Sequence, residues 1–320
     1  MSKSLFIVFF TPALLAIVFY LSFFSPADSK AGPQIFTITA DSSQAEIIDS
    51  LYGQGYLKNL WAFKLIFSLK SHQILPGGYH LSKSQNTFQI ATKLKSSPDL
   101  IWLTFSEGLR KEQIGEILAH NLNWPGDEIE KWNTIYTTTS KDNTEGVYFP
   151  DTYLIPVTET GDFIAQRMIT NFNDKIAPFT EEFAKQNIKW TTAVKLASII
   201  QREAGGNHDM NLIAGILWNR LLTDMKLDID ATVQYARGVT TSGWWTPITP
   251  EDIRSIDSPY NTYKYKGLPP TPICNPGLEA IRAVLSPQET DCLFYLHDHT
   301  GQIYCAKTYQ EHLDNIEKYL

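Results

Sequence analysis

The chain of 320 residues is 43% hydrophobic and 12% aromatic, and its formal net charge is −7. This length and composition suit one large domain or two modest domains with real hydrophobic cores. The acidic balance and the lack of any basic run exclude DNA and RNA as expected partners. Seven histidines and three cysteines are scattered without metal-ligand spacing, so neither a metal nor another cofactor is expected.

The N-terminus contains an uncharged apolar stretch, Leu5–Phe24, that is long enough to cross a bilayer. Lys3 precedes it, whereas Asp28 and Lys30 follow it and nearly cancel. The positive-inside tendency therefore predicts a short cytoplasmic tail at 1–4 and an exported remainder. A cleaved signal peptide is the alternative, although the stretch is long for one and no clear A-x-A site follows. Both interpretations place most of the chain outside the cytoplasm.

An odd number of cysteines in an exported protein leaves at least one thiol unpaired within the chain. Cys292 and Cys305 flank a predicted hairpin. A four-residue loop at 297–300 would bring these two cysteines opposite each other. A Cys292–Cys305 disulfide is therefore a hypothesis, which the mass change on reduction would test.

The segment after the apolar stretch begins with a linker at 25–33, which is rich in small and turn-favouring residues. A module at 34–105 follows. Its patterns predict strands and helices in the order 34–40, 42–53, 60–69, 75–81, 87–95 and 100–105. This small α/β module lacks a catalytic cluster, so a binding or spacing role is expected.

The remainder, 106–320, is predicted to be mainly helical. Helices are expected at 111–121, 161–172, 181–186, 191–204, 209–225, 278–285 and 309–320. The region 124–139 is helical or irregular, whereas 145–153 and 238–257 are predicted to be loops. The aromatic loop at 145–153 is interpreted equally well as a packed corner or as part of a groove.

The stretch TTAVKLASIIQREAGG predicts an amphipathic helix that ends at Gly205-Gly206. Its polar face is predicted to carry Lys195, Ser198 and Arg202. Glu203 instead continues the apolar stripe. Apolar surroundings and the negative end of the helix dipole would both raise its pKa, as a general acid requires. On helix geometry alone, the favoured alternative is a Glu203 that frays into solvent or pairs with Arg202.

Three further polar residues follow that helix. Asn219 lies on an apolar stripe and needs partners, which a helix–helix bond or a ligand would provide. Asp228 and Asp230 suggest a glycosidase-like pairing with Glu203, but Asp230 also fits the cap of the next helix. The loop after it contains Trp244 and Trp245, which suit either sugar stacking or core packing.

Eight motifs then occur in one order along most of residues 34–320. They are SEG at 106–108, EGVYFPDTY at 145–153, ASIIQREA at 197–204, NRL at 219–221, DATVQY at 230–235, SPYNTY at 258–263, GLPPTPICNPG at 267–277 and KTYQEH at 307–312. This set resembles the YceG-like family of endolytic murein transglycosylases. The resemblance implies an α+β protein with an N-terminal transmembrane helix, a LysM-like module and a mixed α+β catalytic domain whose central helix carries the acid/base.

The family's catalytic acid/base falls on Glu203. The resemblance implies lytic cleavage of MurNAc–GlcNAc bonds inside peptidoglycan strands, which leaves 1,6-anhydroMurNAc ends and terminates or trims nascent strands during wall synthesis. The residues expected to position the strand are Asn219, Asp230, Thr232, Tyr235, Tyr260, Asn261 and Tyr263. The family more often has Glu at position 201, so Gln201 is not expected to be a second ionisable catalyst.

Two other functions remain open. One is a peptidoglycan hydrolase in which Asp228 or Asp230 acts beside Glu203, which a short carboxyl separation would favour. The other is a non-catalytic peptidoglycan-binding scaffold. The expected partners are glycan strands, a wall-synthase complex and the inner membrane, with a single-pass anchor and a periplasmic catalytic domain.

Overall fold

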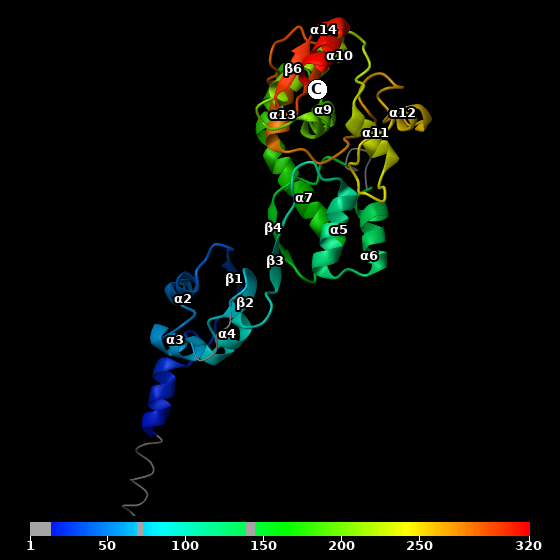
Figure 1. The fold of residues 1–320 in the computed structure, drawn as a ribbon. Coiled ribbons are helices and arrows are strands. Elements are labelled where there is room, and N and C mark those ends of the chain that lie inside the picture. The colour runs from blue at the N-terminus through cyan, green and yellow to red at the C-terminus, as the bar shows by residue number, and fades with distance from the viewer. Residues whose placement is uncertain (1–13, 69–72, 139–144) are drawn as a thin grey trace, which may run out of the picture. The chain divides into compact units, whose positions relative to one another are not determined.

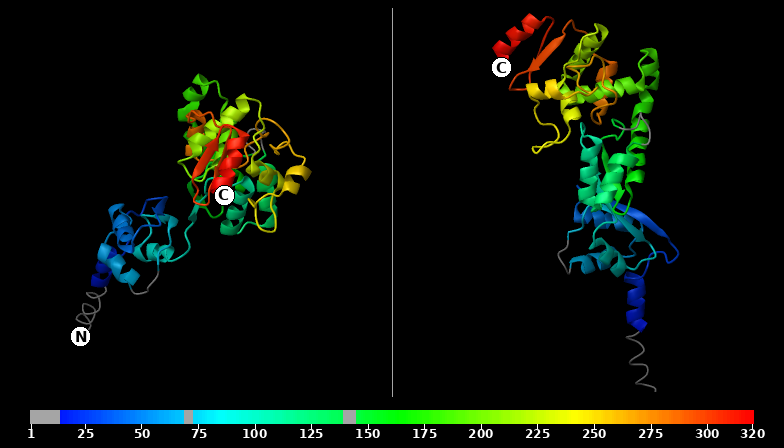
Figure 2. Two further views of the ribbon diagram at one scale, coloured as in Figure 1. Left: turned by 45° about the horizontal axis from the view of Figure 1, so that its top comes forward. Right: turned by 90° about the vertical axis from the view of Figure 1, so that its right-hand side faces the viewer.

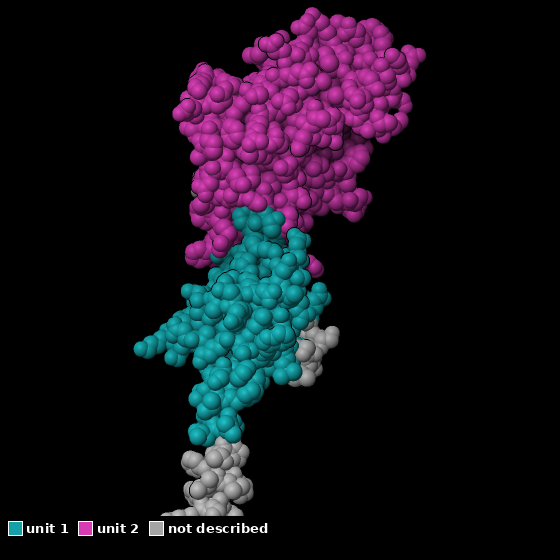
Figure 3. Space-filling model, turned by 90° about the vertical axis from the view of Figure 1, so that its left-hand side faces the viewer, with its two compact units in different colours: residues 1–103, 152–159 teal, residues 104–151, 160–320 magenta. Residues whose placement is uncertain are grey.

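The structure is a computed structural model that describes residues 14–68, 73–138 and 145–320. Its chain divides into two units, which Figure 3 colours separately. Unit 1 comprises residues 1–103 and 152–159, and unit 2 comprises residues 104–151 and 160–320. Both units combine helices with strands, so the fold is mixed α+β, as the sequence predicts (Figure 1).

The N-terminal apolar stretch is described only in part. Residues 14–23 are helical and largely exposed, whereas residues 5–13 of the predicted span lie outside the described residues. No helix in the described part of the chain is long and apolar enough to cross a bilayer.

Unit 1 is built on a four-stranded sheet in the order β1-β2-β3-β4. Its strands are β1 (Pro33–Ile38), β2 (Gly77–Ser82), β3 (Leu100–Thr104) and β4 (Thr152–Pro156). β1 and β2 run antiparallel, with Phe36 opposite Tyr79. β4 was missed by the sequence analysis, which predicted a loop through Tyr153. Its place in the sheet depends on a partner strand almost fifty residues earlier, which local periodicity cannot show.

Besides the helical residues 14–23, the described part of unit 1 contains three helices, and all three were predicted. They are α2 (Gln44–Gly53), α3 (Leu60–Ser68) and α4 (Thr87–Leu94). Capping boxes fix the starts of two of them: Ser43 pairs with Glu46, and Asn86 pairs with Gln89. The apolar faces of the helices pack with the sheet into a core that includes Phe36, Leu51, Phe63, Tyr79 and Ile90.

Unit 2 is mainly helical. Its helices are α5 (Lys111–Leu122), α6 (Gly126–Lys131), η1 (Trp132–Tyr136), α7 (Gly161–Ile176), η3 (Ala177–Phe179), α8 (Thr180–Lys185), α9 (Trp190–Glu203), α10 (Met210–Leu222), α11 (Asp230–Arg237), α12 (Pro250–Ser255), α13 (Leu278–Leu285) and α14 (Tyr309–Tyr319). The prediction of a continuous loop over 238–257 was wrong at α12. That helix begins with Pro250 and has a capping box between Thr249 and Asp252, a signal present in the sequence.

Helix α9 lies at the centre of unit 2 and contacts α10, α11 and α13. Half of its residues are buried, including Leu196, Ile199 and Ile200. The predicted polar face was wrong at Ser198, which is fully buried. Its hydroxyl donates to the Lys195 carbonyl and accepts the Ile273 N–H at 3.0 Å, so these bonds compensate its burial.

A hairpin of β5 (Phe294–His297) and β6 (Ile303–Ala306) precedes α14 and lies beside it (Figure 2). The predicted Cys292–Cys305 disulfide is confirmed, with 5.8 Å between the two Cα atoms. The predicted register was wrong, because Cys305 pairs with Tyr295 rather than with Cys292. The turn between the strands spans residues 298–302 instead of 297–300.

Candidate active site

Glu203 is the last residue of α9, and the backbone after it is held in place. Ala204 leaves the helix with an extended conformation. The N–H groups of Gly205 and Gly206 then donate to the buried carboxylate of Asp209 at 2.9 and 3.3 Å. The helix end is therefore hydrogen-bonded and ordered, unlike the frayed end that the sequence left open.

The Glu203 carboxyl is half-buried and accepts a hydrogen bond from the Tyr295 hydroxyl, with 2.7 Å to Oε2. Burial is the largest influence on its pKa and raises it above the ordinary value of a glutamate. The nearby Asp230 carboxylate raises it further, whereas the Tyr295 bond, His297 and Arg220 act in the opposite direction. The predicted direction of the pKa shift is thus confirmed.

The alternative pairing of Glu203 with Arg202 is not what the structure shows. The guanidinium of Arg202 lies over the Trp245 ring, 4.2 Å from its centroid. This stacking directs the arginine away from its neighbour along the chain. Among the described residues, Tyr295 is the hydrogen-bond partner of Glu203.

The NRL motif at the end of α10 holds the chain that leads into the β5–β6 hairpin. The Asn219 amide donates to the carbonyls of Thr290 and Cys292 at 2.7 and 3.2 Å. Arg220 Nε donates to the Leu293 carbonyl at 2.5 Å. Asn219 therefore makes structural bonds, but to the backbone of the hairpin's entry segment rather than to another helix, as the sequence analysis had offered.

Asp230 and Tyr263 are bonded to each other, and both interact electrostatically with Glu203. The Tyr263 hydroxyl donates to Asp230 Oδ1 at 2.5 Å, and the charge of Glu203 affects the pKa of Tyr263. Asp230 is the first helical residue of α11, and the N-cap position is Ile229, so Asp230 does not cap this helix. Asp228 has a left-handed backbone with φ of 49°, and burial raises its pKa.

Two of the predicted substrate residues are buried and bonded within the protein. Thr232 shares a hydrogen bond with the Thr262 hydroxyl at 2.9 Å. The Asn261 amide donates to the carbonyls of Ile253 and Ile256 at 3.0 and 2.9 Å. Both residues connect α11 or α12 to the SPYNTY segment, so their contacts are those of framework residues.

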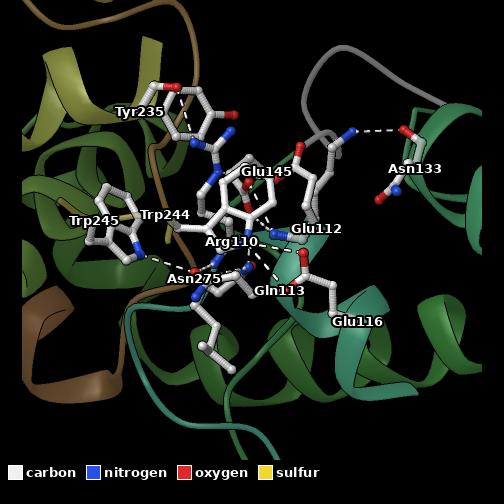
Figure 4. Close-up of polar contacts among 12 residues, drawn as sticks. Arg110, Glu112, Gln113, Glu116, Asn133, Glu145, Tyr235, Trp244, Trp245 and Asn275 are labelled. Atoms are coloured by element: carbon white, nitrogen blue, oxygen red, sulfur yellow. Dashed lines mark hydrogen bonds and ion pairs between the residues drawn. The ribbon is translucent and has the colours of Figure 1, made fainter. Parts of the chain in front are cut away.

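Tyr235 and Tyr260 belong to a second cluster, which is organised around the buried Arg110. The two tyrosine rings lie 4.8 Å apart, and the Arg110 guanidinium is 4.0 Å from the Tyr235 ring centroid. It also lies 4.6 Å from the Trp244 ring (Figure 4). Trp245 donates its indole N–H to Gln113 at 3.0 Å. The tryptophans that the sequence assigned either to sugar stacking or to core packing thus pack against α5.

Glu145 is a second buried carboxyl, which the sequence analysis did not single out. Its oxygens accept the backbone N–H groups of Lys111 and Gly146 and the amide of Asn275. Burial and then the Glu112 carboxylate raise the pKa of Glu145 to about 8. Glu145 ties the start of α5 to two loops, 145–151 and 267–277.

Gln201 also has a defined partner. Its Oε1 accepts the Gly277 N–H at 3.0 Å, which links α9 to the GLPPTPICNPG segment. A glutamine supplies the same kind of acceptor as the glutamate that the family pattern favours. In the described ranges 14–68, 73–138 and 145–320, no group of three or more His, Cys, Asp or Glu side chains is arranged to hold a metal ion.

Five residues in or around the site were not singled out by the sequence analysis: Tyr295, His297, Arg220, Arg110 and Glu145. Arg220 stands inside the NRL motif and Glu145 begins the EGVYFPDTY motif, so motif membership could have indicated both. Tyr295 and His297 are two positions apart on β5 and therefore share one face of the strand. No local signal in the sequence shows that this face meets α9.

The geometry defines an α+β protein whose larger unit presents one half-buried acid at the end of its central helix. The profile of the YceG-like family matches residues 36–318, and the chain belongs to this family.

Relatives of known name agree with that assignment. The chain is 30% identical to an endolytic murein transglycosylase of Bacillus subtilis, over 92% of this chain and 86% of that protein. It is 26% identical to an endolytic murein transglycosylase of Streptococcus pneumoniae serotype 2, over 88% of this chain but only 58% of that relative. It also resembles the crystal structure of a yceG-like protein from Listeria monocytogenes, with a TM-score of 0.60 and 29% identity over 89% of this chain and 99% of that one.

Proposed function

We propose that this chain is an endolytic murein transglycosylase and that Glu203 is its catalytic acid and base. The observation that carries the proposal is the half-buried Glu203 carboxyl, whose pKa is raised by burial at the end of α9. A carboxyl that keeps its proton near neutral pH can act as a general acid. The names of the Bacillus and Streptococcus relatives supply the reaction and the substrate.

The proposed reaction needs one carboxyl in two roles. Neutral Glu203 transfers its proton to the glycosidic oxygen as the bond from that oxygen to C1 of MurNAc breaks. Positive charge develops at C1. The Glu203 carboxylate then takes the proton of the C6 hydroxyl while the C6 oxygen bonds to C1. The products are a free GlcNAc hydroxyl and a 1,6-anhydroMurNAc end, and no water is consumed.

Among the residues proposed to position the strand, the contacts support some more than others. Asp230 and Tyr263 are bonded to each other beside Glu203 and are placed to meet the sugars at the reacting bond. Tyr235, further along α11, and Tyr260 of the SPYNTY segment lie in the Arg110 cluster. Asn219, Thr232 and Asn261 act indirectly in this proposal, by holding the hairpin and the SPYNTY segment.

We further propose that residues 5–24 anchor the protein in the inner membrane by a single span, with the catalytic domain in the periplasm. The support is the uncharged apolar sequence of this stretch. In the same proposal, residues 34–105 form a LysM-like module and residues 106–320 form the catalytic domain. The strand that this domain cuts would be supplied by a wall-synthase complex.

A hydrolase is the second candidate, because the Asp230 carboxylate lies close enough to Glu203 to raise its pKa. Asp230 would then activate water or act as the nucleophile. The two reactions give different ends: lytic cleavage leaves anhydro ends, whereas hydrolysis adds one water and leaves reducing ends.

The test uses the full chain in detergent on purified, uncrosslinked glycan strands, with Glu203→Gln as the control. Mass spectrometry of the products is expected to show internal fragments with 1,6-anhydro ends that the control does not produce. Fragments one water heavier would establish the hydrolase instead. Strands that remain bound but intact with the unmutated protein would favour the scaffold and overturn the proposal.

A further inference from the structure

The β5–β6 hairpin reaches the end of α9 through two residues on one face of β5. Tyr295 and His297 are two positions apart, so their side chains point the same way. Tyr295 binds the Glu203 carboxyl, and His297 Nε2 lies 2.7 Å from Oδ2 of Asp209. Asp209 in turn holds the two glycine N–H groups that follow Glu203. The hairpin therefore fixes both the catalytic side chain and the backbone beside it.

The hairpin itself is fixed from two directions. Asn219 and Arg220 of α10 bind the carbonyls of its entry segment. The Cys292–Cys305 disulfide closes it on the other side. A hydroxyl carried on such a braced strand is preorganised, because little motion must be lost when it binds the carboxyl.

We propose that Tyr295 is a positioning residue whose hydroxyl holds Oε2 of Glu203, so that Oε1 is the oxygen that donates a proton to the glycosidic oxygen and later accepts the proton of the C6 hydroxyl. The proposal rests on the function proposed above for Glu203. The hydrogen bond from Tyr295 goes to Oε2, and none of the described residues donates to Oε1. In the neutral carboxyl the oxygen that accepts this bond is the carbonyl oxygen, so the proton resides on Oε1.

The same bond also favours the reaction energetically. Before proton transfer, Tyr295 donates to a neutral carboxyl. After transfer it donates to a carboxylate, and hydrogen bonds to ionised acceptors are shorter and roughly twice as strong. An interaction that strengthens as the reaction proceeds lowers the barrier, whereas one of constant strength would only improve binding.

Three charged or titratable groups besides Tyr295 affect the pKa of Glu203: Asp230 on α11, Arg220 on α10 and His297 on β5. The Glu203 charge in turn affects the pKa values of Tyr263 in the SPYNTY segment and of Arg202 on α9. The Tyr295 hydrogen bond lowers the pKa of Glu203, against the larger effect of burial. Removing only that hydroxyl should therefore raise the pKa of Glu203 further.

The test compares Tyr295→Phe with Tyr304→Phe in the full chain. Tyr304 lies on the partner strand β6, where its hydroxyl binds Asp298 at 3.2 Å, so the control loses a hydroxyl from the same hairpin. Tyr295→Phe is expected to lower kcat roughly tenfold with little change in KM, the factor that corresponds to losing a charge-assisted bond in place of a neutral one. The basic limb of its pH–kcat/KM profile should move to higher pH, whereas Tyr304→Phe should leave it in place.

A second measurement does not depend on activity. The Glu203 carboxyl resonance, assigned by its loss in Glu203→Gln, is titrated without substrate by ¹³C NMR. A higher midpoint in Tyr295→Phe alone supports the role of Tyr295. If the unmutated protein cleaves strands but neither the midpoint nor the basic limb moves, the role of Tyr295 is overturned. If the midpoint moves but the unmutated protein cleaves nothing, the proposed function of Glu203 fails instead, and with it the proton transfer assigned to Oε1.

Discussion

Glu203 and Glu145 are two glutamates of unit 2 whose pKa values are raised chiefly by burial, as that of Asp228 also is. Their surroundings differ. Glu145 is 1% exposed, and N–H groups of Lys111, Gly146 and Asn275 donate to its oxygens. Glu203 is half-buried and has one protein donor, Tyr295. Among the described residues no group donates to Oε1 of Glu203, whereas both oxygens of Glu145 accept N–H groups of the protein.

The comparison shows that a raised pKa alone does not identify a catalytic acid. The pKa reports how strongly burial disfavours the charged form, and both groups satisfy that condition. Catalysis also requires an oxygen that is free to meet the reacting atom. We therefore assign Glu145 to the framework, where it joins the start of α5 to the GLPPTPICNPG segment through Asn275.

The largest expected effect is the loss of strand cleavage in Glu203→Gln, which would distinguish Glu203 from Glu145. Glu203→Gln should reduce strand cleavage by about 10²–10⁴-fold, the usual contribution of a general acid or base. Its stability should be unchanged or slightly higher, because the amide oxygen can still accept the Tyr295 hydrogen bond. Product release from purified strands and the thermal midpoint would be measured together. Cleavage at the unmutated rate would remove Glu203 from the mechanism.

Removal of the Cys292–Cys305 disulfide is expected to have the next largest effect. Replacing Cys292 and Cys305 by Ser should lower the free energy of unfolding by about 3 kcal/mol, since the bond closes a loop with a sequence separation of 13. Activity should also fall, because Tyr295 and His297 then lie on a less constrained hairpin. Urea unfolding with and without reductant gives the same comparison in the unmutated chain. Identical midpoints in the two conditions would contradict it.

Glu145→Gln should affect stability rather than chemistry. Near neutral pH the Glu145 carboxyl is protonated and carries one O–H donor, whereas the amide brings two N–H donors into a site whose neighbours are N–H donors, and an unsatisfied buried donor costs about 1–3 kcal/mol. Cleavage per folded molecule should stay within a few-fold of the unmutated protein. A variant that folds normally but no longer cleaves would move Glu145 into the catalytic machinery.

The raised pKa of Glu145 also predicts how the free energy of unfolding changes with pH. The folded pKa of Glu145, about 8, lies above the ordinary value of 4.5 for a glutamate, so the folded protein binds more protons than the unfolded chain between these values. The free energy of unfolding should therefore fall as the pH rises from about 4.5 through 8. Urea titrations across this range should show a smaller decline in Glu145→Gln. An equal decline in both proteins would assign the dependence to other groups.

Local patterns in the sequence were sufficient for much of the fold. The apolar period of α9 and its glycine stop located Glu203, and the capping residues Ser43 and Asn86 marked the starts of α2 and α4. These signals succeed because the residues that decide the outcome lie within a few positions of one another.

The contacts that complete the site could not be predicted in this way. Tyr295 lies 92 positions from Glu203 in the chain. The expected register also placed Cys292 opposite Cys305, three residues from the observed partner Tyr295. A register shift by an odd number of residues moves every side chain of a strand to the opposite face of the sheet. The sequence pattern therefore could not show which face of β5 meets α9. Ser198 is similar, because its burial depends on the Ile273 N–H, 75 positions away.

The smallest expected effect tests how Asp230 acts on Glu203. The Asp230 carboxylate raises the pKa of Glu203, so Asp230→Asn should lower that pKa while an amide oxygen still accepts from Tyr263. The basic limb of the pH–kcat/KM profile should move to lower pH, opposite to Tyr295→Phe. Asp228→Asn is the matched control, since asparagine also tolerates the left-handed backbone at that position.

The activity of Asp230→Asn across the pH range distinguishes lytic cleavage from hydrolysis. In lytic cleavage Asp230 is not a reacting group, so Asp230→Asn should retain substantial activity on the acid side of the profile, with anhydro ends among its products. In hydrolysis the second carboxylate activates water or attacks the sugar, and its loss should abolish cleavage at every pH. A variant that is inactive throughout, although folded, would therefore show that Glu203 does not act as the only catalytic carboxyl.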